Sequence, residues 1–355
     1  MRNDMKRLIL AAALALPLSA HAAPVDMTAL RAYVTKAMTR CPNPVLTIEP
    51  ISQGGPQNFL IYEANLRSSD ENCNSRKYVL YSPTTQQVII GTIIALPNDP
   101  RPANVRIAEQ TSEMMKTPLQ ATVSPFPLPD ALKAVTISKN TDYGPFIYHT
   151  FLDGSERFMI VGSRGNLRID PGKTLLENLG VTNGMRRGNK AAKVQIVELS
   201  DFECPTCSRA HKKIEPLIAK NLSKINYTRL DLPLFEHHEW AIPATLGARA
   251  VQRVAPDKYW TFVDYVFNNQ EEIGKMNFDK FLQNWVEDHD IDWKKVATLY
   301  HLPSERAAVL DQVSRAFDNG INSTPTYIVN GQIMGFGPDG AFTYEAIKKA
   351  IEGAK

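Results

Sequence analysis

No feature restricts the fold of this 355-residue chain as strongly as two closely spaced cysteines, Cys204 and Cys207, and their surroundings. Residues 194–199, which precede them, form a mostly apolar run, and this predicts a buried central strand. A helix is predicted to follow, ending at Lys220, after the short loop 200–203. The sulfur of Cys204 is therefore expected at the N-terminus of a helix, where a strand, a loop and the helix meet.

A cysteine at a helix N-terminus is expected to be acidic. Unpaired backbone amides and the positive end of the helix dipole favour a thiolate over a thiol. The thiolate is the reactive species in disulfide exchange, and a second cysteine one turn along can resolve a mixed disulfide. We therefore predict that Cys204 is the nucleophile and Cys207 the resolving cysteine. Pro205 suits the first helical turn, where its missing amide hydrogen has no helical partner to lose.

A structural zinc site and an inert surface disulfide are the alternatives for this pair. Zinc normally takes four ligands, but the chain has no second Cys-x-x-Cys, and the nearby candidates are His211, His237 and His238. We expect no metal and interpret His211 as an ordinary helix residue. Attachment of haem is excluded because Ser208, rather than histidine, follows the second cysteine.

The first 22 residues have the pattern of a cleaved secretory signal. Arg2, Lys6 and Arg7 precede an apolar run, residues 8–18, and then the small-x-small site Ala20-His21-Ala22. The alternative is a membrane anchor, but the run is much shorter than the roughly 20 residues that span a bilayer. The sequence therefore predicts a signal peptide at residues 1–22 and a periplasmic mature protein.

Export also affects how the cysteines are interpreted, because cysteines outside the cytosol are commonly paired. The chain has four, and their spacing favours one disulfide between Cys204 and Cys207 and another between Cys41 and Cys73. The second pair is predicted to be structural. A formal charge of +3 and a sequence pI of about 8.5 give no indication of a nucleic-acid partner.

The composition, with 43% hydrophobic residues, suits two globular domains. Residues 23–185 are predicted to form an N-terminal α+β domain. In it a helix at 26–39 is followed by strands at 45–48, 59–64, 78–81 and 88–94. Prolines between residues 97 and 129 suggest a connector with a short helix, and an Asp-Gly pair predicts a hairpin at 146–161. Residues 186–355 are predicted to form the second domain.

A second motif carries a resemblance to a known family. The stretch from Val197 to Cys207, together with Ser323-Thr324-Pro325-Thr326 ahead of a strand pair, resembles the DsbA-like thioredoxin-fold oxidoreductases of bacteria. The resemblance covers residues 192 to the end. It implies an α/β thioredoxin-like fold with a helical insert at about 238–318, followed by a closing helix. The active-site sequence is then Cys-Pro-Thr-Cys.

The resemblance also implies roles for further residues. Pro325 is expected to be a cis-proline beside the cysteine pair and, with Thr324, to hold an extended substrate. Pro205 and Thr206 complete the expected substrate-binding set. Glu198 resembles the buried acid that this fold often keeps beneath its cysteines and could relay protons to or from Cys207. The alternative is that Glu198 points outward or pairs with a lysine.

The leading functional hypothesis is a thiol-disulfide oxidoreductase that forms disulfides in exported proteins. We expect no cofactor other than the redox-active Cys204–Cys207 disulfide. An isomerase or reductase of the same fold and a chaperone-like peptide-binding module are the alternatives. The resemblance further implies cysteine-containing exported proteins as substrates and a membrane redox partner. A homodimer through the N-terminal domain is suggested by architecture alone, and the direction of exchange stays open.

Overall fold

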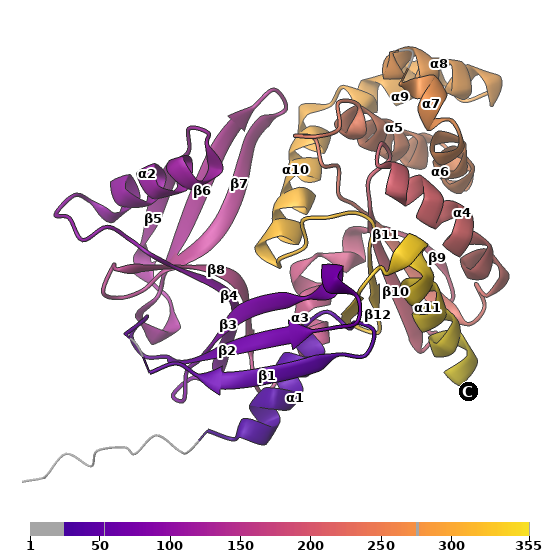
Figure 1. Ribbon diagram of the computed structural model, residues 1–355. Coiled ribbons are helices and arrows are strands. Elements are labelled where there is room, and N and C mark those ends of the chain that lie inside the picture. Colours follow the sequence, from indigo (N-terminus) through magenta and orange to yellow (C-terminus); the bar gives the residue numbers. More distant parts are fainter. Residues whose placement is uncertain (1–24, 53, 275–276, 355) are drawn as a thin grey trace, which may run out of the picture.

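The computed structural model describes residues 25–354 except for 53, 275 and 276, and these residues form two sheets with their helices (Figure 1). The predicted signal peptide, residues 1–22, lies outside the described residues. Among those described, no helix is both long enough and apolar enough to cross a membrane. A sheet-rich N-terminal region precedes a second region of mixed strands and helices, in agreement with the two-part organisation predicted above.

The N-terminal region is built on one eight-stranded sheet in the order β1-β2-β3-β4-β8-β7-β6-β5, in which all neighbours pair antiparallel. Two helices cover different parts of it. Leu30 and Val34 of α1 pack on strands β2 to β4, and Ile107 of α2 packs on strands β6 to β8. The bounds are α1 Met27–Ala37, β1 Val45–Pro50, β2 Leu60–Arg67, β3 Ser75–Tyr81, β4 Gln87–Ala95, α2 Ala103–Met115, β5 Gln120–Pro127, β6 Lys133–Thr141, β7 Gly144–Leu152, β8 Phe158–Asn166 and α3 Pro171–Asn178.

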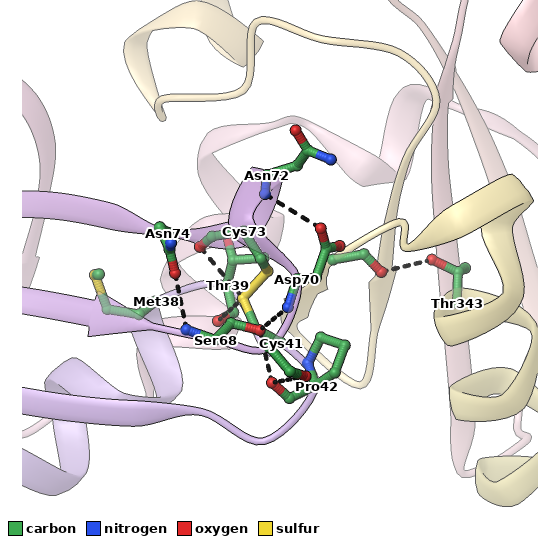
Figure 2. The surroundings of a disulfide bond; sticks show 12 residues. Met38, Thr39, Cys41, Pro42, Ser68, Asp70, Asn72, Cys73, Asn74 and Thr343 are labelled. Carbon is green, nitrogen blue, oxygen red and sulfur yellow. Dashed lines mark hydrogen bonds between the residues drawn. A yellow bond between two sulfur atoms is a disulfide. The ribbon is translucent and has the colours of Figure 1, made fainter.

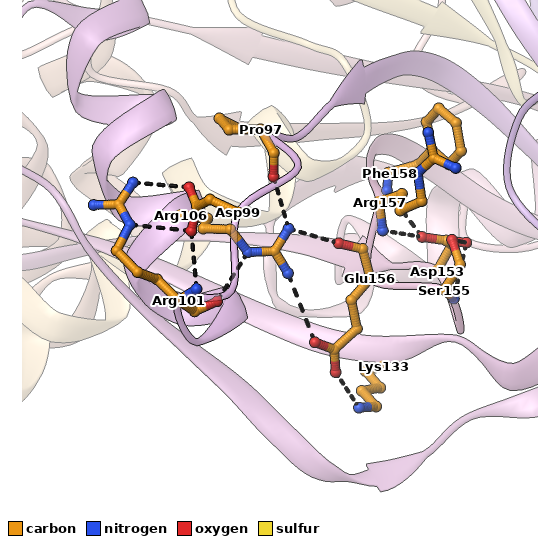
Figure 3. A network of polar contacts seen from close by, with 10 residues as sticks. All are labelled: Pro97, Asp99, Arg101, Arg106, Lys133, Asp153, Ser155, Glu156, Arg157 and Phe158. Atoms are coloured by element: carbon orange, nitrogen blue, oxygen red, sulfur yellow. Dashed lines mark hydrogen bonds and ion pairs between the residues drawn. The ribbon is translucent and has the colours of Figure 1, made fainter.

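The short helix predicted between residues 97 and 129 is confirmed as α2, but the interpretation of this stretch as a connector is wrong, because it also contains the edge strand β5. The prolines in this stretch favoured the interpretation as a connector, although an edge strand tolerates proline where no ladder hydrogen bond is needed. The Arg106 guanidinium ties α2 to the sheet by donating to the carbonyls of Pro97 and Glu156 (Figure 3). In the same view the buried Asp153 carboxylate accepts hydrogen bonds from the backbone amides of Arg157 and Phe158. These bonds stabilise the predicted Asp-Gly turn.

The C-terminal sheet has five strands in the order β13-β12-β10-β11-β9, and its central pair, β10 and β11, is parallel. Helices α4 and α11 cover one face, and the helical insert covers the other. The bounds are β9 Met185–Gly188, β10 Val194–Ser200, α4 Pro205–Lys220, β11 Ile225–Asp231, α5 Ala241–Val254, α6 Tyr259–Asn268, α7 Gln270–Ile273, α8 Phe278–Asp288, α9 Trp293–Tyr300, α10 Pro303–Asp318, β12 Thr326–Val329, β13 Gln332–Met334 and α11 Ala341–Gly353.

Strand alternation in β10 decides which side chains face the helix that carries the cysteines. Ile196 packs among buried residues of α4, whereas Val197 and Leu199 belong to the core beneath the insert. Successive side chains of a strand point to opposite faces. Glu198 and Ser200 therefore share the α4 face with Ile196.

The two regions meet where the Cys41–Cys73 disulfide of the N-terminal region lies beside the outer strand β13. Cys41 and Cys73 are joined with their Cα atoms 6.0 Å apart. Next to them the backbone of Arg40 exchanges hydrogen bonds with Ile333 and Gly335, which extends the sheet beyond β13. A Cβ atom on Gly335 would lie 2.7 Å from the Cys73 sulfur, so only glycine allows this approach. Figure 2 shows the disulfide beside the Ser68 and Asp70 turn.

A second junction lies along β7 and α10 (Figure 1). His149 of β7 bonds to Asp318 of α10 through both its backbone amide and its ring, at 2.8 and 2.7 Å. Phe146 is 1% exposed and packs edge-on against Phe317. Since Phe146 belongs to the main core of the C-terminal region, this core extends into the N-terminal sheet at β7.

Candidate active site

Cys204 is the N-cap residue of α4, and Pro205 occupies the first helical position. Cys204 is 6% exposed, Cys207 is fully buried, and the two thiols are not bonded to each other in this structure. Pro205 is exposed beside them and Thr206 is half-buried. The geometry leaves the Cys204 sulfur as the accessible one of the pair.

The surroundings of Cys204 favour its thiolate. A hydrogen bond from the Cys207 thiol is the largest influence, and together with donation from Thr324 and the backbone amides of Cys207 and Thr206 it lowers the pKa of Cys204 to about 5. Burial opposes this shift but does not cancel it. At neutral pH the reduced pair therefore carries one negative charge, located on Cys204.

Cys207 is shifted in the opposite direction. Burial raises the pKa of Cys207 well above the ordinary value, and the hydrogen bond to Cys204 and the negative charge there raise it further. The Asp201 backbone and the Ser200 hydroxyl oppose the shift. The pair thus has a thiolate at its accessible end and a protonated thiol at its buried end.

A cis peptide bond between Thr324 and Pro325 lies next to the cysteines, just before β12. The Cys204 sulfur is 3.6 Å from the Thr324 carbonyl oxygen. The buried Thr324 hydroxyl has no partner other than Cys204 among the described residues. The structure thus brings Thr324 to the sulfur and gives Pro325 the predicted cis bond, and the binding of substrate by these two residues stays a prediction.

Glu198 is 3% exposed in the middle of β10 and does not point outward. It accepts a hydrogen bond from the Tyr227 hydroxyl, and its other oxygen has no partner among the described residues. Tyr327 faces Glu198 across the β10–β12 pair, and the charges of Glu198 and Cys207 both act on its phenol. Glu198 therefore lies beneath α4 with one free oxygen, and its proton-relay role remains a prediction.

Sequence reasoning missed the importance of Asp201, a fully buried carboxylate in the loop before Cys204. One oxygen accepts the Glu203 amide at 2.8 Å. The other accepts the Leu234 amide at 2.8 Å and contacts Nδ1 of His238 at 2.6 Å. The hydrogen bond to Asp201 raises the pKa of His238, and the negative charges of Cys204 and Glu203 also contribute. The only sequence signal was a charged residue between an apolar strand and the cysteines.

Gln270 fixes the loop from the opposite side. Its amide nitrogen donates to the carbonyls of Phe202 at 2.7 Å and Cys204 at 3.1 Å. Gln270 lies on α7 of the insert, 66 residues beyond Cys204, so no local pattern could have identified it. The insert thereby holds the active-site loop as well as covering the sheet.

The three histidines considered as zinc ligands lie in different settings. His211 contacts Asp264 at 2.7 Å and packs on the Phe267 ring, as an ordinary helix residue does. His237 is exposed, and His238 faces Asp201. Within the described residues, no group of three His, Cys, Asp or Glu side chains is arranged to hold a metal ion.

Comparison with known proteins places the C-terminal half of the chain. A family model described as thioredoxin matches residues 181–353. Disulfide bond formation protein D of Bacillus subtilis is 26% identical over 176 residues, which cover 46% of this chain and 74% of that protein. The Na+/H+ antiporter NhaA 1 of Salinispora arenicola is 28% identical over 204 residues, or 53% of this chain. The chain spans only 29% of that antiporter's length.

Two solved structures are similar over about half of the chain. The crystal structure of oxidised BdbD from Bacillus subtilis shares 21% identity with a TM-score of 0.41, covering 49% of this chain and 95% of that one. The thiol-disulfide exchange protein α-DsbA2 from Wolbachia pipientis shares 18% identity with a TM-score of 0.43, covering 52% and 98%. The thioredoxin match over residues 181–353 confirms the predicted thioredoxin-like fold of the C-terminal half, and with the cysteine pair at the start of α4 this half is similar to the DsbA-like thiol:disulfide oxidoreductases.

Proposed function

We propose that this protein is a periplasmic dithiol oxidase that forms disulfides in exported proteins through Cys204 and Cys207. The observation that supports this direction is the asymmetry of the pair: Cys204 has a pKa of about 5, whereas burial keeps Cys207 protonated. A strongly stabilised thiolate stabilises the reduced form, and a protein whose reduced form is stabilised is an oxidant.

The reaction takes two exchange steps. A substrate thiolate attacks the Cys204 sulfur of the enzyme disulfide, and Cys207 leaves and takes up a proton. A second substrate thiolate then attacks the substrate sulfur of the mixed disulfide, and Cys204 leaves as a thiolate. Two electrons pass from the substrate to the enzyme, and a thiol of low pKa is the better leaving group in the second step.

The buried acid and the cis-proline loop supply the supporting roles in this proposal. Glu198 lies beneath α4 with one free oxygen, from which it can deliver the proton that Cys207 needs on leaving. The Thr324 carbonyl beside the Cys204 sulfur suits an extended chain that adds to the backbone there. In this proposal a membrane redox partner reoxidises the Cys204 and Cys207 thiols after each turnover.

The direct test is oxidation of a reduced, unfolded protein with two cysteines by the full-length chain, followed as loss of free thiols. We expect stoichiometric oxidation by the disulfide form and loss of the reaction in Cys204→Ser. A chaperone-like module would instead suppress aggregation equally well in both proteins. Reduction of a substrate disulfide by the dithiol form, with no oxidation in the reverse assay, would contradict the oxidase direction.

A further inference from the structure

The hairpin of β6 and β7 reaches from the N-terminal region to the edge of the active site. Its tip, residues 139–144, contacts the rim segment, which we define as residues 234–240. The Tyr143 hydroxyl donates to the Glu239 carbonyl at 3.2 Å, and Lys139 forms an ion pair with Glu236. The Phe235 ring lies edge-on to Tyr143, with centroids 6.0 Å apart.

The rim segment has no helix or strand of its own, so side-chain contacts on its two sides fix its position. The N-terminal hairpin supplies one side. The loop before the cysteines supplies the other, because Asp201 accepts the Leu234 amide at 2.8 Å and Glu203 accepts the Trp240 amide at 2.6 Å. An irregular segment held from one side only keeps more conformational freedom.

His238 lies on this segment and connects it to the chemistry of Cys204. Its ring contacts Asp201 at 2.6 Å, and its imidazolium and the Cys204 thiolate attract each other. Tyr143 reaches the same neighbourhood, since the negative charges of Asp142, Glu203 and Glu239 act on its phenol. A continuous set of contacts thus runs from the N-terminal hairpin through the rim segment to Asp201 and Glu203, in the loop that precedes Cys204.

We propose that the tip of the β6–β7 hairpin is a positioning element of the active site, with Tyr143 as its main residue. It holds the rim segment against Asp201 and Glu203 and thereby keeps the cation of His238 beside Cys204. The N-terminal region then contributes to thiolate stability as well as to architecture. The inference rests on the proposed exchange function of Cys204, and it makes Tyr143 a positioning residue, not a catalytic one.

The charged groups around Cys204 determine how this can be measured. The Cys207 thiol and the Thr324 side chain donate to the sulfur from α4 and the cis-proline loop. His238, whose charge interacts with that of Cys204, lies on the rim segment near Asp201 and Glu203. His238 has a raised pKa, so it stays protonated while Cys204 titrates near its pKa of about 5. Loss of the hairpin contact should therefore raise the Cys204 pKa.

The experiment is a titration of reduced, full-length protein by the ultraviolet absorbance of the thiolate. We expect Tyr143→Ala to raise the pKa of Cys204 by roughly half a unit, and Tyr143→Phe, which loses only the hydroxyl donor, to raise it less. His149→Ala is the matched control, because it removes a contact between the same hairpin and α10 away from the rim segment. It should leave the pKa of Cys204 unchanged.

A second variant pair tests the route through His238. His238→Gln should raise the Cys204 pKa more than Tyr143→Ala does, and in the His238→Gln background the Tyr143 substitution should add nothing. An unchanged pKa in Tyr143→Ala, or an equal rise in His149→Ala, would overturn the inference. A wild-type Cys204 that titrates near the free value of about 8.5 would instead contradict the proposed function, which makes the two failures distinguishable.

Discussion

The two cysteine pairs of this chain differ in the groups that surround their sulfur atoms. Cys204 lies at the N-terminus of α4, where hydrogen-bond donors favour its thiolate, and its partner Cys207 is three residues farther along. Cys41 and Cys73 are 32 residues apart, bonded and buried where the N-terminal sheet meets Gly335. The comparison teaches that the groups around a sulfur set its reactivity, and it predicts different consequences for substitution of each pair.

The largest effect is expected at the accessible sulfur. Cys204→Ser should lower the rate of disulfide exchange by a factor on the order of a thousand, because serine provides no thiolate. Cys207→Ser, mixed with a disulfide-containing substrate, should instead accumulate the mixed disulfide, because the Cys204 thiolate attacks the substrate disulfide and no second enzyme thiol resolves the product. Nonreducing electrophoresis detects it. If Cys204→Ser exchanged disulfides as fast as wild type, Cys204 would not be the reactive sulfur, and the proposed difference between the two pairs would be wrong.

The structural pair should matter for stability and not for exchange. A double Cys41→Ser and Cys73→Ser variant should lose about 3 to 4 kcal/mol of stability in the chain-entropy account of a 32-residue loop. Urea unfolding measures the loss, and the thiolate titration of Cys204 is the control that should not change. A large change in the Cys204 pKa would mean that the disulfide acts on the active site through β13.

These contrasts also show how far the sequence could lead. Export and spacing together predicted the Cys41–Cys73 disulfide, and the apolar run with its following helix located Cys204 at a helix start. The edge strand β5 was missed because its prolines resemble those of a linker, although an edge strand tolerates them. A pattern along the chain indicates only local conformational preference. That β5 is an edge strand follows from the strand order in the folded sheet.

The active-site surroundings were less predictable than the cysteines. Asp201 acquires its role only when the rim segment folds back to place Leu234 and His238 against it. Gln270 reaches the loop from a helix 66 residues away from Cys204. Contacts between such distant residues depend on tertiary packing and leave no periodic signal in one sequence.

Substitution of Glu198 should affect the two cysteines of the reactive pair differently. Glu198→Gln keeps the shape of the side chain but cannot release a proton, so steps in which Cys207 gains or loses one should slow by about tenfold. Stopped-flow kinetics of substrate oxidation across pH measures this. The pKa of Cys204 should change little, and a large loss of folded protein in Glu198→Gln would point to a structural role instead.

The smallest effect is expected at the contact between β7 and α10. The hydrogen bond to Asp318 raises the pKa of His149, so its contribution to stability is fully present below about pH 6.5 and is lost as the pH rises through the raised pKa. Because His149 is largely exposed, His149→Ala should cost only about 0.5 kcal/mol. Unfolding of wild type and variant at several pH values should show the difference shrinking toward high pH. A difference that grows with pH would contradict the assignment.

The most direct test of the account is the redox equilibrium of Cys204 and Cys207 against a glutathione series, in a Cys41→Ser and Cys73→Ser background so that only this pair exchanges. The stabilised thiolate predicts an oxidising potential close to the roughly −120 mV of the strong oxidase DsbA. A potential near the roughly −270 mV of thioredoxin, or a pair that does not exchange reversibly, would contradict the oxidase account.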